Sequence, residues 1–527
     1  MLFRAFVLTL LLAFAHGAQA NNFRWASQGD VVTLDPHSFN EGLNDNIGGL
    51  VYELLVTRDK TKPNQLNPGL AVSWTNPTPR TWVFKLRQGV KFHDGTPFTA
   101  DDVVFSVNRA RETNAFRQFA NQAGVPRKID DYTVEFTTPV PNPIMLETLF
   151  SLRMMSKAWC EKHGVTMAQS LSRNEVTFAA RNANGTGPYR LLTWEPGVKI
   201  VHQKNAEWWG LKEGRMEGNV DAIEYRPISN AATRMAALQS GEVDFVLDPS
   251  VQDIPKLRAN SSLKVWEGSE NRLIYLGFDQ DRDQLLYADV KGKNPFKDKR
   301  VRMALYQSID INALKTQVMR GLSIPTALPL AAGLDSGVPA SMEKRHVYDL
   351  VAAKKLLAEA GYPDGFGFTL LCPNDRYIND EKICVALASM WARAGVNVKI
   401  EAIPKAQFFP RLTRREVSAW LHGWGTASTH AIETFKAVLH SRDDKGAGFV
   451  NFGQFKDAEL DTVIDKIESE MNVAERQALV NRAVQITQDE VYIIPLHRQI
   501  IPWVSRKNVS VVHSPDNRLE PLWVRVD

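Results

Sequence analysis

The chain has 527 residues, of which 44% are hydrophobic and 23% are charged, and its formal net charge is +4. This composition is ordinary for a globular protein, and the length suggests about three domain-sized units. The small net charge is spread along the chain, which argues against the dense basic surface that nucleic-acid binding requires. We therefore expect no nucleic-acid partner.

The first twenty residues have the pattern of a secretory signal. Arg4 precedes an apolar run from Ala5 to Ala15, and an Ala-x-Ala end predicts cleavage after Ala20. The run is shorter than the ~20 apolar residues that cross a bilayer. No cysteine lies at the cleavage site, so a lipid anchor is not expected. A membrane anchor or a buried N-terminal strand remains the alternative to export.

Apolar periodicity and turn residues predict alternating strands and helices along the body. Thr99 has the character of a helix N-cap, with Asp102 at the capping-box position. Strands are expected at residues 23–26, 81–86, 90–95, 189–194, 199–203, 241–245, 272–278, 368–371, 396–400, 419–424, 491–496 and 509–512. Helices are expected at residues 43–54, 99–107, 231–238, 299–308, 350–360, 381–394, 457–469 and 474–490. This alternation indicates an α/β layer with parallel strand pairing.

Three cysteines bear on the compartment and on metal binding. Cys372 and Cys384 lie twelve residues apart, so in an oxidising compartment they form either a local disulfide or two buried thiols. Cys160 is left over, and we expect it to be buried. No Cys/His spacing suits zinc, and we expect neither a metal site nor a cofactor.

Two short motifs resemble a catalytic pair and a phosphate-binding loop, but both are better explained as turns. His93-Asp94-Gly95 ends a predicted strand, and no nucleophile motif accompanies it. Gly185-Thr186-Gly187-Pro188 lacks the backbone N–H at Pro188 that a phosphate-binding loop would offer. With no Gly-x-Ser-x-Gly elbow either, we do not expect an enzyme.

An ordered series of motifs covers essentially the whole mature chain. The motifs are TLDP (33–36), WVFKLRQGVKFHDG (82–95), TADDV (99–103), GTGPY (185–189), NAEWWG (205–210), NPF (294–296), VRMAL (301–305), LLAEAGY (356–362) and IPL (494–496). Each is weak alone, but the series resembles the extracellular solute-binding proteins, family 5, the peptide- and nickel-type receptors of ABC importers.

This resemblance implies an α/β protein of the periplasmic binding type, with two lobes, a hinge and an inserted subdomain in lobe 1. Lobe 1 would combine residues 21–47, 185–271 and 489–527 with an extension, residues 48–184. Lobe 2 would span residues 272–488. Closure around a ligand would be a hinge motion. We expect a monomer in the periplasm.

The resemblance also points to ligand-binding residues on lobe 2. Asn374 and Arg376 follow a predicted strand, where related dipeptide receptors use an arginine to bind a carboxylate. A guanidinium offers two parallel donors for that purpose. Equally, Arg376 could be a surface arginine paired with Asp375 or Asp380. Trp424 could stack on a ligand or pack in the core.

The loop after Trp424 departs from the family pattern. Peptide-binding relatives carry an aspartate there that holds the ligand's amino terminus, whereas this loop offers Thr426, Ser428 and His430. Glu433 could replace the aspartate, or it could begin a helix. On lobe 1, the family places Phe39, Asn40 and Glu41 along the cleft, and Glu41 is another possible partner for an ammonium group.

The resulting hypothesis is a binding protein without chemistry, which captures a small peptide or peptide-like solute and delivers it to a membrane permease of the ABC type. The missing aspartate keeps a second hypothesis open, with the same fold and an opine, oligosaccharide, metal chelate or haem as ligand. A secreted hydrolase and a periplasmic chaperone are the remaining alternatives.

Overall fold

A computed structural model describes residues 21–60, 62, 65–113, 115–170, 176–374, 376–426, 428–444 and 446–527. The signal sequence expected over residues 1–20 lies outside these residues. Within them, no helix is both long enough and apolar enough to span a membrane.

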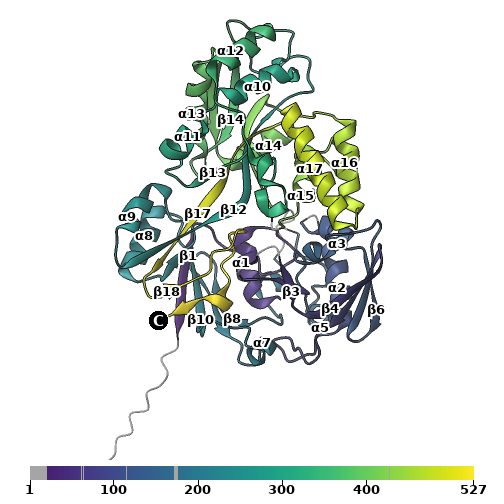
Figure 1. Cartoon of the computed structure of the whole chain (residues 1–527). Coiled ribbons are helices and arrows are strands. Elements are labelled where there is room, and N and C mark those ends of the chain that lie inside the picture. Colours follow the sequence, from purple (N-terminus) through teal and green to yellow (C-terminus); the bar gives the residue numbers. More distant parts are fainter. Residues whose placement is uncertain are drawn as a thin grey trace, which may run out of the picture.

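Two long strands run through the middle of the molecule and join its lower and upper parts (Figure 1). They are β12 (Leu263–Phe278) and β17 (Ile494–Arg506), and they pair in antiparallel fashion. We keep the names lobe 1 for the lower part and lobe 2 for the upper part. The exact residues at which the lobes meet stay a prediction.

One sheet extends through both lobes in the order β15-β14-β16-β12-β17-β11-β1-β10-β9-β8, with β13 beside β17. Parallel pairs join β1 to β10 and β11, and β14 to β15 and β16. The other pairs are antiparallel, so the expectation of parallel pairing was only partly right. The strands are β15 (Asn397–Ile403), β14 (Gly367–Pro373), β16 (Ala419–Gly425), β11 (Phe245–Val246), β1 (Asn22–Ser27), β10 (Ala222–Pro227), β9 (Lys199–Lys204), β8 (Tyr189–Glu195) and β13 (Ser323–Pro325).

In lobe 2 the sheet is covered by helices on both faces, and the alternation along β12 explains why. Ile274 and Leu276 point to one buried cluster, and Leu273 and Tyr275 point to the other. Successive side chains of a strand face opposite sides, so both faces of β12 are apolar. The first cluster packs against α10 (Lys299–Gln307), α12 (Leu350–Glu359) and α13 (Asp380–Ala392). The second packs against α14 (Lys405–Thr413), α15 (Ile432–Thr434), α16 (Ala458–Ser469) and α17 (Val473–Glu490).

Lobe 1 has a core of its own beneath the sheet. Phe23 and Trp25 of β1 pack with Ile223 and Tyr225 of β10, and Ile47 of α1 (Gly42–Val51) joins the same cluster. Helices α8 (Ala231–Ser240) and α9 (Ile254–Arg258) cover a further cluster beside β11.

The extension of lobe 1 is a small sheet with helices packed on it. Its strand order is β4-β5-β7-β6, and its buried side chains form a separate cluster. Thr99 precedes α2 as predicted, and Asp102 accepts the Thr99 N–H at 2.8 Å. The elements are β4 (Ala71–Thr78), β5 (Thr81–Leu86), α2 (Ala100–Arg111), α3 (Arg117–Ala123), β6 (Val125–Asp130), β7 (Thr133–Thr137), α4 (Met145–Leu149) and α5 (Lys157–Lys162).

Residues 90–95 do not form the predicted strand. Only an isolated bridge between Lys91 and Pro97 is present there, and His93 instead contacts the turn at Gly185 and Gly187. A Cβ at Gly185 would lie 2.0 Å from the Val51 carbonyl oxygen, so this close approach requires glycine. Backbone contacts with a second loop have replaced a strand ladder.

Cys372 of β14 and Cys384 of α13 are joined by a disulfide, so of the two possibilities left open by the sequence the structure contains the bridge. Both lie in the first lobe 2 cluster. Cys160 is a buried free cysteine in lobe 1.

Candidate ligand site between the lobes

The pairing of β12 with β17 is interrupted where the two lobes meet. The register shifts between Ser269 and Leu273, and the three intervening residues, Glu270-Asn271-Arg272, are polar. Glu270 is 8% exposed, and both of its carboxylate oxygens have partners: Arg272 Nε donates to one at 3.0 Å and Gln499 Nε2 to the other at 2.7 Å. A buried carboxylate with both oxygens engaged avoids most of the cost of desolvation.

The loop that follows β14 presents Arg376 beside this junction. Its shape is fixed by Asp380, which accepts the backbone N–H groups of Arg376 and Tyr377 at 2.9 Å each. The Arg376 guanidinium lies 5.3 Å from the centre of the Tyr377 ring. Desolvation and the nearby charge of Arg272 lower the pKa of Arg376. Arg272 is itself paired with Glu270, so an anion beside Arg376 would offset the remaining repulsion between the two guanidinium groups.

Lobe 1 contributes the residues that precede α1. Glu41 caps the helix and accepts the N–H groups of Leu43 at 2.9 Å and Asn44 at 3.2 Å. Phe39 and Asn40 line a hollow of about 20 Å³ in lobe 1. The Glu41 charge reaches Arg376 and raises its pKa, against the larger effect of desolvation. Glu41 and Arg376 are therefore where the predicted residues of the two lobes approach each other.

The loop after β16 is held largely by its own polar groups. Thr426 donates from Oγ1 to the Ser428 carbonyl at 2.6 Å, and Ser428 Oγ accepts the His430 N–H at 2.9 Å. Burial lowers the pKa of His430 to about 4, so the ring is neutral at neutral pH. These contacts give the three residues a structural task, and their role in binding stays a prediction.

Trp424 has a different character. Its ring meets Phe449 edge to face at 5.7 Å, and its buried Nε1 has no hydrogen-bond partner among the described residues. The next residue, Gly425, lies opposite Arg272 on β12, and a Cβ there would be 2.9 Å from the guanidinium carbon. Arg272 therefore covers the face of β16 on which Gly425 lies, whereas Trp424 pairs with Leu273 and packs against the cluster on the opposite face.

Sequence reasoning missed Glu270, Arg272 and Gln499. One signal could have found the first two, because the charged run Glu270-Asn271-Arg272 interrupts a long apolar strand pattern. Gln499 lies on β17, where the polar run His497-Arg498-Gln499 interrupts the apolar pattern in the same way. The predicted residue Asn374 is exposed, and its backbone N–H donates to the Ile403 carbonyl.

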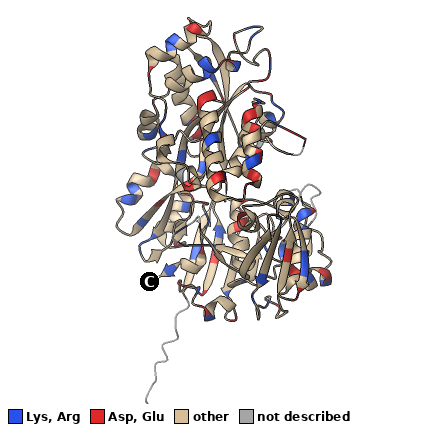
Figure 2. Ribbon diagram, turned by 45° about the vertical axis from the view of Figure 1, so that its right-hand side comes forward, with Lys and Arg blue, Asp and Glu red and all other residues tan. Residues whose placement is uncertain are grey.

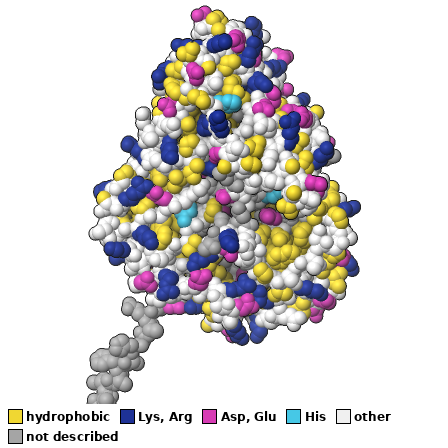
Figure 3. Space-filling view, viewed as in Figure 1, with side chains coloured by type: hydrophobic (Ala, Val, Ile, Leu, Met, Phe, Trp, Pro, Cys, Tyr) yellow, Lys and Arg dark blue, Asp and Glu magenta, His cyan; other side chains and the backbone are white. Residues whose placement is uncertain are grey.

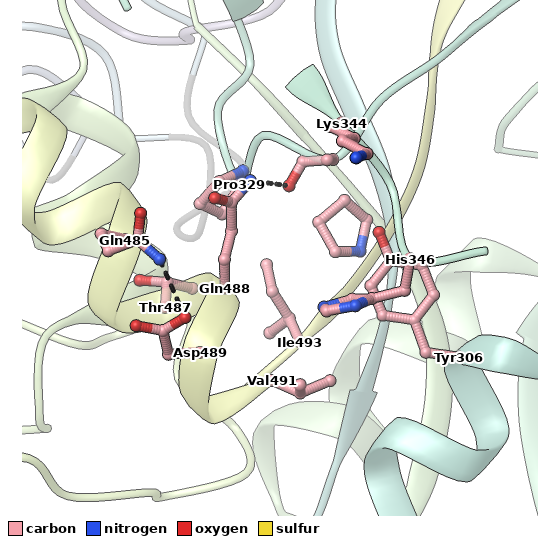
Figure 4. Close-up of a pocket in the computed structure, with 12 residues that line it drawn as sticks. Tyr306, Pro329, Lys344, His346, Gln485, Thr487, Gln488, Asp489, Val491 and Ile493 are labelled. Carbon is pink, nitrogen blue, oxygen red and sulfur yellow. Dashed lines mark hydrogen bonds between the residues drawn. The ribbon is translucent and has the colours of Figure 1, made fainter. Parts of the chain in front are cut away.

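Two larger cavities flank this region. One, of about 190 Å³, lies between the extension of lobe 1 and helices α15 and α16 of lobe 2. Figure 3 shows hydrophobic side chains gathered over the extension, near α3. The other, of about 180 Å³, is lined from lobe 2 and from the start of β17, with Lys344 and Asp489 on opposite sides (Figure 4). Only the first is lined by the extension of lobe 1.

The charged groups are distributed without a dominant face. Figure 2 shows basic and acidic residues interspersed over both lobes. Among the described residues, no group of three or more His, Cys, Asp or Glu side chains is placed to hold a metal ion. Burial, with smaller contributions from Arg272 and Arg376, lowers the pKa of His422 to about 3, so this histidine is a neutral core residue.

Comparisons with known proteins agree with this architecture. Heme-binding protein A of Haemophilus influenzae is 25% identical over 513 residues, which cover 92% of this chain and 88% of that protein. The periplasmic oligopeptide-binding protein OppA of Escherichia coli is 26% identical over 511 residues, covering 90% and 87%. The solved structure of the periplasmic binding protein DppA of Helicobacter pylori, in complex with the peptide STSA, has a TM-score of 0.76 at 22% identity and covers 96% of this chain and 98% of that chain.

The structural similarity confirms the predicted two-lobe fold, and these relatives are binding proteins. The profile of the bacterial extracellular solute-binding proteins, family 5 Middle, matches residues 65–446. That match spans more than half of the sequence and includes most of the motifs on which the resemblance was based. The chain therefore belongs to the bacterial extracellular solute-binding proteins of family 5.

Proposed function

We propose that this protein captures a small peptide or peptide-like solute between its lobes and passes it to the permease of an ABC importer. The observation that carries the proposal is the electrostatic interaction of Arg376 of lobe 2 with Arg272 beside it and with Glu41 of lobe 1. Neighbouring guanidinium groups suit a carboxylate. The predicted export signal supports a site of action in the periplasm.

In this proposal each element has one task. Arg376 binds the carboxylate of the solute, and Arg272 adds charge while it remains paired with Glu270. Glu41 approaches from lobe 1, so binding at Arg376 favours the closed arrangement of the lobes. No group of the site needs to change its covalent state, and capture and release alone describe the function.

A second candidate keeps the fold and changes the ligand. The loop after Trp424 carries no aspartate, and Heme-binding protein A shows that a relative of similar identity is named for a non-peptide ligand. A haem, opine, oligosaccharide or metal chelate would still use the arginines if it carried a carboxylate or another anion.

Native mass spectrometry of protein purified gently from the periplasm separates these candidates. A mass difference that disappears on denaturation identifies the captured solute, and a peptide is the expected result. Titration with a tripeptide library would then show binding by wild type and at least about tenfold weaker binding by Arg376→Ala. A sugar, opine, chelate or haem in the released fraction would replace the peptide assignment. If no small solute binds saturably in either experiment, the proposal that the protein captures a solute is contradicted.

A further inference from the structure

The cavity between the extension and lobe 2 is lined by apolar side chains of both lobes and by four amide side chains of the extension, Gln118, Asn121, Gln122 and Asn142. Pro139, Val140 and Ile144 line it from lobe 1, and Ile432 and Ile467 line it from lobe 2. Its volume of about 190 Å³ is below the roughly 300 Å³ at which pockets for whole small molecules begin. The cavity therefore suits one side chain or tail of a larger ligand.

One carboxylate in the wall of this cavity lacks a hydrogen-bond or ion-pair partner among the described residues. Glu433 lines the cavity, and within the described part of the chain no hydrogen bond or ion pair engages its carboxylate. The other charged groups of the wall are Lys436 and Glu468, which pair with each other at 2.9 Å, and Lys436 also pairs with Asp465 at 3.0 Å. Lys436 is thus already paired with two carboxylates, whereas the Glu433 carboxylate has no cationic partner among the described residues.

The surroundings of Glu433 sharpen this imbalance. Burial and the charge of Glu147 on α4 of lobe 1 raise the pKa of Glu433 to about 7, and Arg58 opposes them only in part. Burial likewise raises the pKa of Glu147, and the charges of Arg58 and Arg476 lower it in part. Two carboxylates that approach each other across the lobes, with too little positive charge between them, would each be stabilised by an added cation.

From this geometry we infer that the cavity is a subsite for a cationic group on an aliphatic stem, with Glu433 as its anionic end and the apolar residues of both lobes around the stem. The inference rests on the proposed function, since the occupant would be part of the captured solute, such as a lysine- or arginine-like side chain. Because both lobes line the cavity, its occupant would bridge them and favour closure.

The probe for this subsite is n-hexylammonium, with 1-hexanol as the uncharged analogue of the same length. Binding is followed by titration calorimetry and by the NMR shifts of the Ile144, Ile432 and Ile467 δ-methyl groups, which report the cavity walls. We expect the isoleucine shifts for both probes and about tenfold tighter binding of the ammonium at pH 8. Equal affinities, or shifts confined to other methyl groups, would overturn the inference without any variant.

Two variants test the role of the carboxylate. Glu433→Gln should reduce the preference for the ammonium to less than about threefold. Glu459→Gln removes the same charge from α16, where Glu459 pairs with Arg482, and should leave the preference intact. A preference retained in Glu433→Gln would assign the cation to another group and overturn the inference.

Hexylammonium contains no peptide bond and no carboxylate, so its binding does not depend on peptide capture. If it binds as expected while no peptide binds, the subsite stands and the peptide assignment fails. If peptides bind through Arg376 and hexylammonium shows no charge preference, the proposed function stands and the subsite fails.

Discussion

The lobes meet at two junctions of opposite character. At the strand junction, β12 and β17 pair on both sides of a break at residues 270–272, where Glu270 accepts hydrogen bonds from Arg272 and Gln499. At the face junction, Ile144 of lobe 1 is buried in a lobe 2 cluster, and Met471 of lobe 2 packs against the extension cluster. Nothing covalent joins the lobes there, and Glu433 lies near Glu147 without a partner.

This difference separates contacts that hold the fold together from contacts that can change when the lobes open and close. The strand junction engages both carboxylate oxygens of Glu270 within the protein, so it contributes to the stability of the fold in every state. The face junction buries apolar surface at the cost of bringing two carboxylates together, so its net free energy is small and open to change by a ligand or by pH. Breaking each junction should therefore have distinct consequences.

The largest effect is expected at the strand junction. Glu270→Ala leaves Arg272 partly buried without its anion and Gln499 without its acceptor, and should lower the free energy of unfolding by about 3 kcal/mol. Urea denaturation measures this loss. Gln499→Ala is the control, because it removes a single neutral partner and should cost only about 1 kcal/mol. A loss below that in Glu270→Ala would show that the pair does not support the fold.

The next effect concerns closure and not unfolding. Ile144→Ala removes apolar surface from the face junction and should destabilise the closed arrangement by about 1–3 kcal/mol. Small-angle scattering would record a larger radius of gyration. Ile129→Ala makes the same change at a site of the extension that is 46% exposed, and should have no effect. Identical scattering from both variants would refute a role of Ile144 in closure.

The face junction should also respond to pH. Burial and Glu147 raise the pKa of Glu433 from 4.5 to about 7, against Arg58, so the closed state retains a proton that the open state releases. Closure is therefore favoured as pH falls from about 7 towards 4.5, by up to about a hundredfold in the closed-to-open ratio. Scattering at pH 5 and pH 8 measures the change.

The same experiment on Glu433→Gln supplies the check on this pH dependence. The variant should lose most of the difference between pH 5 and pH 8, because the amide does not titrate. A wild-type protein that is more compact at pH 8 than at pH 5 would reverse the predicted sign.

The smallest effect is expected for a hydrogen bond that crosses the lobes at the surface. Gln252 Nε2 donates to Asn379 Oδ1 at 3.1 Å, and the pair is exposed. Gln252→Ala should lower the free energy of unfolding by less than about 0.5 kcal/mol and leave the scattering profile unchanged. A larger change would mean that surface contacts share the control of closure with Ile144.

Much of the fold could be predicted from the sequence where a regular apolar pattern continues over many residues. The helices at 350–360 and 474–490 are present with bounds shifted by one residue, and the strand at residues 272–278 is the last part of β12, which begins at Leu263. The first part of β12 was missed because Lys264 and Glu267 interrupt its pattern. Residues 90–95 were misassigned because a loop contact across the chain, invisible in local sequence, took over the backbone of His93.

The candidate site could be predicted only in part. The family resemblance led to Glu41 and Arg376, which do approach each other, but their roles in binding stay predictions. Arg272 and Glu270 were not found, because their importance comes from a register shift between two strands that lie far apart in sequence. The isolation of Glu433 depends on burial and on the pairing of Lys436, and neither is encoded in spacing alone.

The sheet that continues through both lobes has a consequence for proteolysis. Strands of both lobes pair with β12 or β17. Cleavage of one peptide bond in an exposed loop therefore leaves every strand pair of the large sheet intact. The segment around Lys344 and Val347 is exposed and lies in lobe 2. A protein nicked there should elute as one particle and separate into two fragments only after unfolding, which would allow the halves to be labelled and recombined.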